Sequence, residues 1–355
     1  MAYPQWVGKV LAADRVRSTA GEVNVQWYGA DGNAGIGAVA VTTAAVASAQ
    51  AVADLTGRGL YFPLGAYYLS AGLLVTRPQM SLRGDVGTEI HMIGAGPILT
   101  LDGGVGPIVG VAMFECNIEN LILVGTALAT RGIWLRNVNQ STFTNIRVED
   151  VTEAALYLET ATSNLFTNFA CTVNRRFFAT QPNAGIYLTK RAGDPHGVTS
   201  MNVWVNPMIE GLDSPADLAQ GYGLHLVDGT ENAFLGGTLE GNRRDIKLEA
   251  DALVNYFTTI TLVKNAFTQY SISCAGGFNV FETMYVQSTV TWEIGARGNT
   301  LARGAYFDTI TNLSALEQCY DHPVINNAAA LVDPVTVNAA DRRYWDQGMN
   351  AWSSA

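Results

Sequence analysis

One phrase recurs along the middle of the chain, and its spacing constrains the fold more than any other feature. An aromatic residue leads each copy, and apolar side chains follow at alternate positions, which is the period of a β-strand. The copies begin at Phe143, Phe166, Trp204, Phe234, Phe257 and Phe281. These starts are 23, 38, 30, 23 and 24 residues apart, and a recurrence near 23 with occasional inserts is typical of a solenoid. Stacked coils of this kind predict an all-β fold, a right-handed parallel β-helix.

Composition argues against several classes of protein. The formal charge of −10 makes a nucleic-acid partner improbable, because such proteins set clustered Lys and Arg against phosphates. No stretch is apolar enough to span a bilayer, since Thr42, Thr43, Ser48 and Gln50 interrupt the Ala-rich run at 38–53. The four cysteines lie far apart, without the spacing of a zinc site. We therefore expect no nucleic-acid partner, no membrane insertion, no metal and no cofactor.

The order of patterns divides the chain into four segments. They are a leader or attachment segment (1–22), a capping region (23–70), the parallel β-helix (71–313) and a C-terminal cap or contact between subunits (314–355). Within the capping region, a helix is predicted from Thr42 to Leu55, with Thr42 or Thr43 as its N-cap residue. A helix laid across the open end of a solenoid protects its unpaired backbone edge.

The capping region also carries a resemblance to a known family. V-N-V-Q-W-Y-G-A-D-G (Val23–Gly32), an Ala-rich helix and Y-F-P-L-G-A-Y (Tyr61–Tyr67) stand in the order that opens proteins of the pectate-lyase-like superfamily, especially phage tailspikes and capsule depolymerases. The resemblance implies a parallel homotrimer that binds a bacterial surface polysaccharide and attaches to a phage tail or baseplate through its N-terminus. Because the chain begins without a secretory signal, we expect it on the virion, or outside the cell after lysis.

Two acidic residues share one position of the repeat. Six residues after the leading aromatic residues stand Glu149, Thr172, Glu210, Glu240, Val263 and Gln287. Neighbouring strands lie about 4.8 Å apart, so Glu210 and Glu240 should be on the order of 5 Å from each other on consecutive coils. Retaining glycosidases hold their two carboxyl groups roughly 5–5.5 Å apart. The pair therefore predicts acid/base cleavage of a glycosidic bond, unless each Glu only accepts backbone N–H groups of the turn that follows it.

A second charged column lies three residues further along the repeat. It contains Thr152, Arg175, Asp213, Arg243 and Ala266, and Arg176 and Arg244 directly follow its two arginines. Asp213 would lie between arginines of neighbouring coils, either as a nucleophile or base, or as part of a ladder that holds anionic sugar groups. The alternative is a row of solvent-exposed ion pairs that only ties the coils together. Tyr222 and His225, close to the inserts, complete the predicted substrate-binding residues, with Tyr222 as a ring on which a sugar stacks.

These patterns favour an endo-acting polysaccharide depolymerase that works as a glycoside hydrolase. Its catalytic carboxylates would come from Glu210, Glu240 and Asp213. The substrate would be positioned by Arg175, Arg176, Arg243, Arg244, Tyr222 and His225. A polysaccharide lyase is the first alternative, because an arginine could neutralise a uronate while a base removes its α-proton. A non-catalytic receptor-binding tail protein is the second alternative, since one fold can host many functions.

Overall fold

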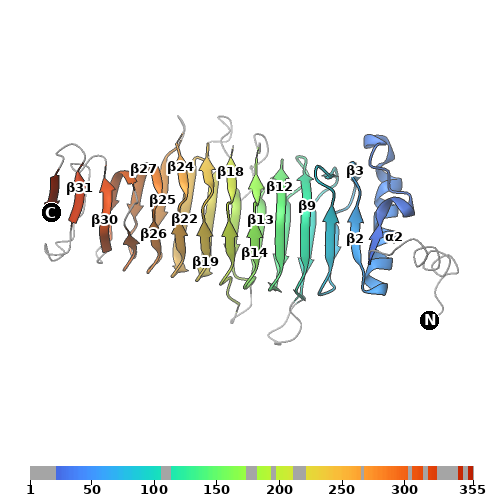
Figure 1. Cartoon of the computed structure of the whole chain (residues 1–355), viewed down its shortest axis with the longest axis horizontal. Helices are drawn as coiled ribbons and strands as arrows, with labels where there is room; N and C mark the ends of the chain where they lie inside the picture. Colours follow the sequence, from blue (N-terminus) through green and yellow to red (C-terminus); the bar gives the residue numbers. More distant parts are fainter. Residues whose placement is uncertain are drawn as a thin grey trace.

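The chain forms an elongated right-handed parallel β-helix, with the N-terminal helix at one end and the C-terminus at the other (Figure 1). The computed structural model describes residues 21–104, 113–172, 182–192, 197–210, 221–264, 268–302, 306–314, 319–325, 343–346 and 351–354. Each strand of the coils pairs in parallel with strands one coil before and one coil after it. The pairing defines three faces, and the predicted fold is confirmed.

The first and second faces follow each other directly along the chain. The first face contains β1 (Glu22–Asn24), β2 (Gly59–Phe62), β5 (Ser81–Gly84), β14 (Leu165–Thr167), β17 (Val203–Val205), β20 (Ala233–Leu235), β23 (Tyr256–Thr258), β26 (Val280–Glu282) and β28 (Thr300–Leu301). The second face contains β3 (Ala66–Leu69), β6 (Glu89–Met92), β15 (Ala170–Cys171), β18 (Met208–Glu210), β21 (Thr238–Glu240) and β24 (Thr261–Val263). Three longer strands cover both faces: β9 (Asn117–Val124), β12 (Thr142–Glu149) and β30 (Cys319–Ile325).

The third face carries the longest regular strands. It contains β4 (Leu73–Val75), β7 (Leu99–Asp102), β10 (Arg131–Arg136), β13 (Ala154–Glu159), β16 (Ala184–Thr189), β19 (Tyr222–Thr230), β22 (Arg244–Leu253) and β25 (Tyr270–Cys274). β27 (Tyr285–Trp292) and β29 (Tyr306–Asn312) run from the second face onto the third. β8 (Met113–Phe114) pairs with β11 (Val138–Asn139), and β31 (Arg343–Asp346) forms an antiparallel pair with β32 (Ala351–Ser354).

A stack of aromatic rings fills the interior behind the first face. Its members are Phe143, Phe166, Trp204, Phe234, Phe257 and Phe281, all 0% exposed. Successive ring centroids are 4.4–5.0 Å apart, and successive planes lie within 13° of each other. Because the strand register brings the same repeat position of each coil into line, the rings stack face to face. The predicted alignment of the six leading aromatic residues is confirmed.

Two ladders of asparagine residues form the tight corners of the coil. One ladder is buried where the third face leads into the first: Asn164, Asn202, Asn232, Asn255, Asn279 and Asn299. Each side chain in it bonds to the next side chain and to backbone groups, which satisfies polar atoms that would be costly to bury alone. The other ladder is exposed between the first and second faces, at Asn120, Asn145, Asn168 and Asn206. There the backbone φ is positive, a conformation that Asn tolerates better than most residues.

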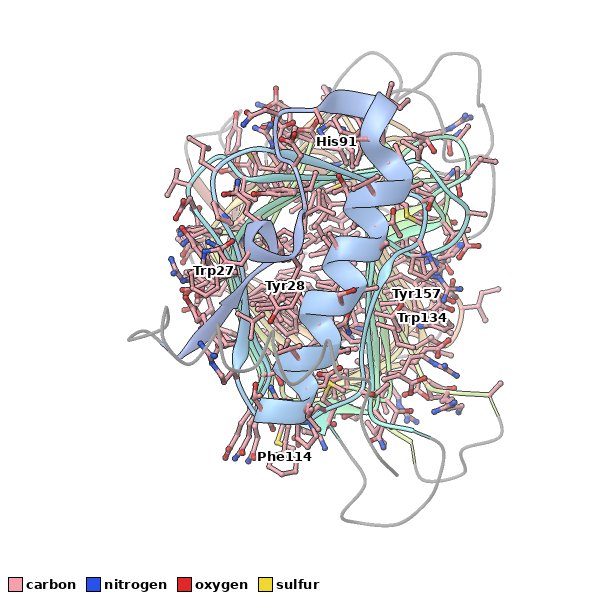
Figure 2. All side chains as sticks on the ribbon, turned by 90° about the vertical axis from the view of Figure 1, so that its right-hand side faces the viewer. Trp27, Tyr28, His91, Phe114, Trp134 and Tyr157 are labelled. Atoms are coloured by element: carbon pink, nitrogen blue, oxygen red, sulfur yellow. The ribbon has the colours of Figure 1, made fainter. Side chains whose placement is uncertain are left out.

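The N-terminal helix covers the open end of the coil, as predicted (Figure 2). α2 spans Val39–Thr56 and follows two short 3-10 helices, η1 (Val25–Tyr28) and η2 (Gly35–Ala38). The predicted N-cap was wrong, because Thr42 is buried inside the helix and the Thr43 hydroxyl accepts a hydrogen bond from the Ser70 N–H. Gly57 ends the helix in the left-handed conformation.

The N-terminal helix is also unusually apolar. The expectation that no stretch is apolar enough to span a bilayer was wrong, because Gly35–Thr56 is long and apolar enough by length and hydropathy alone. Its buried residues, among them Val46, Ala49 and Ala53, belong to the continuous hydrophobic core that runs into the first coils. Packing against the coil end thus accounts for an apolar helix at this position.

Candidate functional site

The acidic pair, Glu210 and Glu240, lies where the second face ends. Glu210 closes β18 and Glu240 closes β21, and the two residues are direct register partners on consecutive coils. Ile209 and Leu239, one position earlier, point into the core and are fully buried. Alternation along the strand therefore turns both glutamates outward. Glu210 is half-buried and Glu240 is exposed, so a ligand on the outer surface can reach the pair.

A third glutamate of the same column, Glu149, differs from the acidic pair because it has an ion-pair partner. Glu149 forms an ion pair with Arg147 of its own strand, at 2.7 Å. Within the described part of the chain, neither the Glu210 nor the Glu240 carboxylate forms an ion pair or a hydrogen bond, and Glu240 is followed by the fully described turn at 241–243. The alternative role, in which the carboxylate only accepts backbone N–H groups of the following turn, therefore has no supporting contact at Glu240.

The long corner, which connects the second face to the third, differs in length from coil to coil. It follows Glu149, Cys171, Glu210, Glu240 and Val263. Arg175, Arg176 and Asp213 belong to two of its longest copies and lie outside the described residues. The proposed ladder of Asp213 and arginines thus remains a prediction from the sequence.

Three of the predicted binding residues, Tyr222, His225 and Arg244, lie together on the third face, directly beyond the long corner. Arg244 donates from Nη1 to the Tyr222 hydroxyl at 3.2 Å and from Nε to Gln269 Oε1 at 3.0 Å. Its guanidinium lies 5.3 Å from the ring centre of Tyr222 and 5.7 Å from that of Tyr270. Arg243 precedes β22 at the corner itself. These contacts hold the guanidinium of Arg244 in place, on the strand that follows Glu240.

His225 and Tyr222 are more buried than the sequence interpretation required. Tyr222 is 8% exposed, with the His225 ring 4.5 Å away, so its ring supports its neighbours and does not offer the open stacking surface that was predicted. His225 is 9% exposed and lies within a strand, with Nε2 3.1 Å from Glu249. The hydrogen bond from His225 lowers the pKa of Glu249. This pair keeps a charged carboxylate at the surface of the third face.

A row of outward aromatic rings on the third face was not among the predicted residues. The outer row consists of Trp134, Tyr157, Tyr187 and His225, which are register partners on β10, β13, β16 and β19. Figure 2 shows Trp134 and Tyr157 on the outer side of one flank. A signal exists in the sequence, because each of these residues stands between two aliphatic ones, as in I-W-L, L-Y-L, I-Y-L and L-H-L. An alignment of the repeats on their leading aromatic residues does not show this signal, because the leading residues belong to the first face and the outer row to the third.

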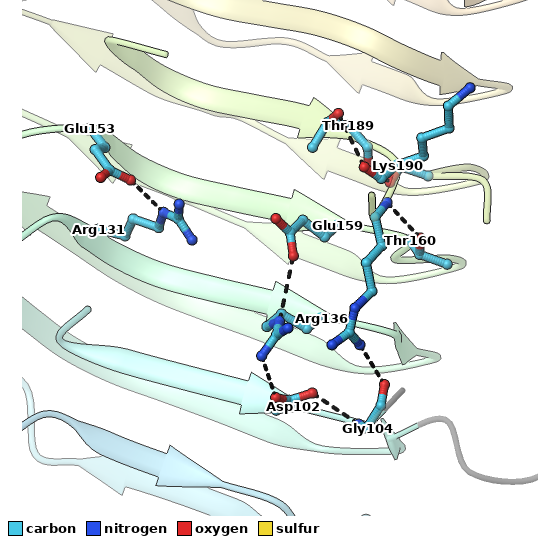
Figure 3. A network of polar contacts seen from close by, with 11 residues as sticks. Asp102, Gly104, Arg131, Arg136, Glu153, Glu159, Thr160, Thr189 and Lys190 are labelled. Atoms are coloured by element: carbon cyan, nitrogen blue, oxygen red, sulfur yellow. Dashed lines mark hydrogen bonds and ion pairs between the residues drawn. The ribbon is translucent and has the colours of Figure 1, made fainter. Parts of the chain in front are cut away.

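Ion pairs flank the outer row (Figure 3). Arg131 pairs with Glu153 at 2.7 Å, and its guanidinium lies 4.1 Å from the Trp134 ring centre and 3.9 Å from that of Tyr157. Arg136 lies between Asp102 at 2.6 Å and Glu159 at 3.5 Å. Each charged group is hydrogen-bonded or ion-paired to a neighbouring coil, so the side chains are held rigidly at the surface.

One carboxyl group near the acidic pair is buried. Asp245, the second residue of β22, is 0% exposed, and burial raises its pKa to about 8. Its Oδ1 accepts a hydrogen bond from the Asn242 side chain at 3.3 Å. Burial thus favours the protonated form of Asp245, which belongs to the interior. No group of three or more His, Cys, Asp or Glu in the described residues could hold a metal ion.

Comparisons with known proteins bear on the fold. No family model matches the sequence, and the search of curated proteins found no match. The chain is similar in structure to the ORF18 protein of Geobacillus virus E2, with a TM-score of 0.50 and 14% identity over 90% of this chain and 65% of that one. This chain thus spans less than two thirds of the length of the viral protein.

Two bacterial structures are also similar. The A-module of the mannuronan C-5 epimerase AlgE4 of Azotobacter vinelandii has a TM-score of 0.53 and 12% identity, over 87% of this chain and 89% of that one. An alginate lyase from a Paenibacillus species has a TM-score of 0.51 and 10% identity, over 88% and 99%. At these identities the similarity shows the fold alone. The fold implied by the resemblance to the pectate-lyase-like superfamily is confirmed.

Proposed function

We propose that the protein is a tailspike-type depolymerase, which binds a bacterial surface polysaccharide and hydrolyses its glycosidic bonds. The observation that carries this proposal is the register of the acidic pair. Glu210 and Glu240 are Cα partners on adjacent parallel strands, and neighbouring strands lie about 4.8 Å apart. That spacing fits the retaining mechanism, in which carboxyl groups lie roughly 5–5.5 Å apart.

In this mechanism one glutamic acid donates its proton to the glycosidic oxygen as the bond to the anomeric carbon breaks. The other carboxylate attacks the anomeric carbon and forms a glycosyl ester. The first residue, now a carboxylate, removes a proton from water, which attacks the same carbon and releases the sugar, so both glutamates return to their starting states. Asp213 is a further candidate acid from the sequence. Substrate contacts are assigned to Arg175, Arg176, Arg243 and Arg244.

The solvent side of the first face supports assembly as a homotrimer. One outward column there contains Thr142, Leu165, Val203, Ala233, Tyr256 and Val280, in register. The column is uncharged over six coils, and a flat uncharged sheet can pack against copies of itself. In this proposal the trimer belongs to a phage tail, attached through the N-terminal part of the chain, and leaves the third face open to the polysaccharide.

A polysaccharide lyase is the second candidate. The observation in its favour is Arg244, which Tyr222, Gln269 and Tyr270 hold at the long corner. A guanidinium in that position could neutralise the carboxylate of a uronate while a base removes the α-proton. The products separate the candidates, because a lyase leaves an unsaturated sugar that absorbs in the near ultraviolet, whereas a hydrolase leaves new reducing ends without it.

The test replaces each member of the acidic pair by glutamine, which keeps its shape and polarity. Glu210→Gln and Glu240→Gln should each lower turnover by about 100-fold or more, because a proton transfer or a nucleophilic attack is lost, while retention by the polysaccharide stays unchanged. Glu149→Gln is the matched control, since it lies in the same column but pairs with Arg147. Reducing ends released from purified capsules and O-antigens measure the turnover.

Each outcome decides between the candidates. Near wild-type cleavage by both glutamine variants would exclude the acidic pair and direct attention to Asp213 and the arginines. Added azide, a small nucleophile, should restore the turnover of an alanine variant that lacks the nucleophilic residue, which identifies that residue. A polymer that wild-type protein binds but leaves intact would show a non-catalytic receptor-binding protein.

A further inference from the structure

We infer that the outer row is a binding track for an uncharged polysaccharide, whose chain lies along the solenoid axis and crosses one strand for each sugar. This inference rests on the proposed function in one respect, namely that the ligand is a polysaccharide. It adds the position of the chain, its direction and its charge. The track comprises Trp134, Tyr157, Tyr187 and His225 with the ion pairs beside them.

The geometry of the rings suits an extended polymer. Adjacent ring centres are 6.3 Å apart for Trp134 and Tyr157, 4.8 Å for Tyr157 and Tyr187, and 5.2 Å for Tyr187 and His225. Trp134, Tyr157 and Tyr187 are half-buried, so part of each ring meets solvent while the rest is packed. Strands repeat about every 4.8 Å, close to the length of one pyranose unit. Apolar C–H groups of successive sugars can therefore contact successive rings.

The charges beside the rings argue for a neutral ligand. Asp102, Glu153 and Glu159 contribute three carboxylates, against the two guanidinium groups of Arg131 and Arg136. These five side chains are 16–23% exposed, so their pairs are partly shielded from water. A polyanion would have to displace these carboxylates from the arginines. Hydroxyl groups of a neutral sugar can instead donate to the same carboxylate oxygens.

The C-terminal part of the track shows the same pairing. Lys190 lies 3.1 Å from Asp228, and Lys247 lies 2.6 Å from Glu293. His225 contacts Glu249 at 3.1 Å. The two lysines beside the row are thus each paired with a carboxylate of the protein, so an acidic polymer would have to compete with these carboxylates.

The track leads to the acidic pair. Its last ring, His225, is in β19, the strand that follows Glu210 on the same coil, and β22 follows Glu240 on the next coil. β19 and β22 pair directly. A chain held on the row therefore ends beside the two coils that carry the proposed reaction, so the track would hold the polymer while its end, or a bond within it, is cleaved.

The experiment measures retention by immobilised polymers in affinity electrophoresis. The probes are purified neutral O-antigen polysaccharides and, as a polyuronate, sodium alginate. Wild-type protein and the Glu240→Gln variant should be retained by at least one neutral polymer and not by alginate. Trp134→Ala and Tyr187→Ala should weaken that retention by about tenfold or more. Tyr68→Ala on the second face is the matched control, because Tyr68 is also a half-buried outward ring, and its retention should not change.

Several results would overturn the inference. They are retention by alginate alone, no retention by any polymer, or folded Trp134 and Tyr187 variants that bind as well as wild type. A changed sedimentation coefficient of both row variants would assign the row to a contact between copies, and also count against it. Melting curves identify a variant that is merely unfolded, and Tyr187→Phe, which keeps the ring, should bind normally. Loss of turnover in the glutamine variants is independent of these results, so the two proposals fail separately.

Discussion

The wall of the β-helix carries two columns of aromatic residues with the same period and opposite surroundings. Behind the first face, the inner stack from Phe143 to Phe281 is fully buried, with planes within 13° of parallel. On the third face, Trp134, Tyr157 and Tyr187 of the outer row are half-buried and His225 is 9% exposed, and adjacent rings meet at angles from 52° to 76°. A guanidinium group contacts Trp134 and Tyr157 of the outer row, whereas the inner rings belong to the continuous hydrophobic core.

The difference shows that the role of an aromatic residue depends on whether its side chain points into the core or out to solvent. An inward ring has no polar partner and gains stability from the area it removes from water. An outward ring keeps an edge in water, which makes it available to a ligand and places charged neighbours within reach. Inner aromatic residues should therefore contribute mainly to stability, and outer ones mainly to binding.

The largest expected effect comes from truncating one ring of each column. Phe234→Ala should lower the free energy of unfolding by about 3–5 kcal/mol, because it removes a fully buried ring that touches Trp204 and Phe257. Tyr187→Ala should cost about 1–2 kcal/mol, since that ring is only half-buried. Denaturant titration of both variants measures the difference. Equal losses would contradict the division of roles between the two columns.

A smaller effect is expected from the asparagine ladders. Asn232 Oδ1 accepts hydrogen bonds from the backbone N–H and the side chain of Asn202, and its Nδ2 donates to Thr199 and Asn255. Asn232→Ala leaves the N–H of Asn202 buried without a partner and should cost about 1–3 kcal/mol. The control is Asn206→Gly in the exposed ladder, because glycine accepts the positive φ there. Its melting temperature should barely change, and an equal loss in both variants would refute a special cost for the buried ladder.

A third prediction concerns pH and the buried carboxyl group of Asp245. Its pKa of about 8 in the folded protein exceeds the ordinary value of 3.8, so the folded state binds more protons than the unfolded state between about pH 4 and pH 8. Stability should therefore fall as pH rises through this window, by at most about 1.4 kcal/mol per pH unit. Asp245→Asn should flatten this dependence and change stability little at pH 4.

Unfolding midpoints measured from pH 4 to pH 9 provide the comparison for Asp245. Asp251→Asn, on the same strand but exposed, is the matched control and should retain the wild-type slope. A wild-type protein whose stability does not fall between pH 5 and pH 8 would show that the interior tolerates the charge of Asp245.

The sequence was sufficient for the register of the acidic pair but not for the residues around it. The repeat places Glu210 and Glu240 at equal distances from Trp204 and Phe234, and the strands pair in that register. The surroundings depend on the long corner, whose length changes from coil to coil. No alignment of repeats could show that Arg244 lies against Tyr222, or that the Tyr222 ring is closed to a stacking sugar.

The sequence by itself determined the coil, because alternating apolar residues and a period near 23 leave one way to bury a continuous stack of rings. It also determined which acids line up, since parallel strands one coil apart match residue for residue. Only the tertiary structure decided how the third face meets the second, because inserts of unequal length break the period there. Packing across that corner brings Tyr222, His225 and Arg244 together. The ion pairs of the outer row also depend on the tertiary structure, because they join charged residues of different coils that meet only when the coils stack.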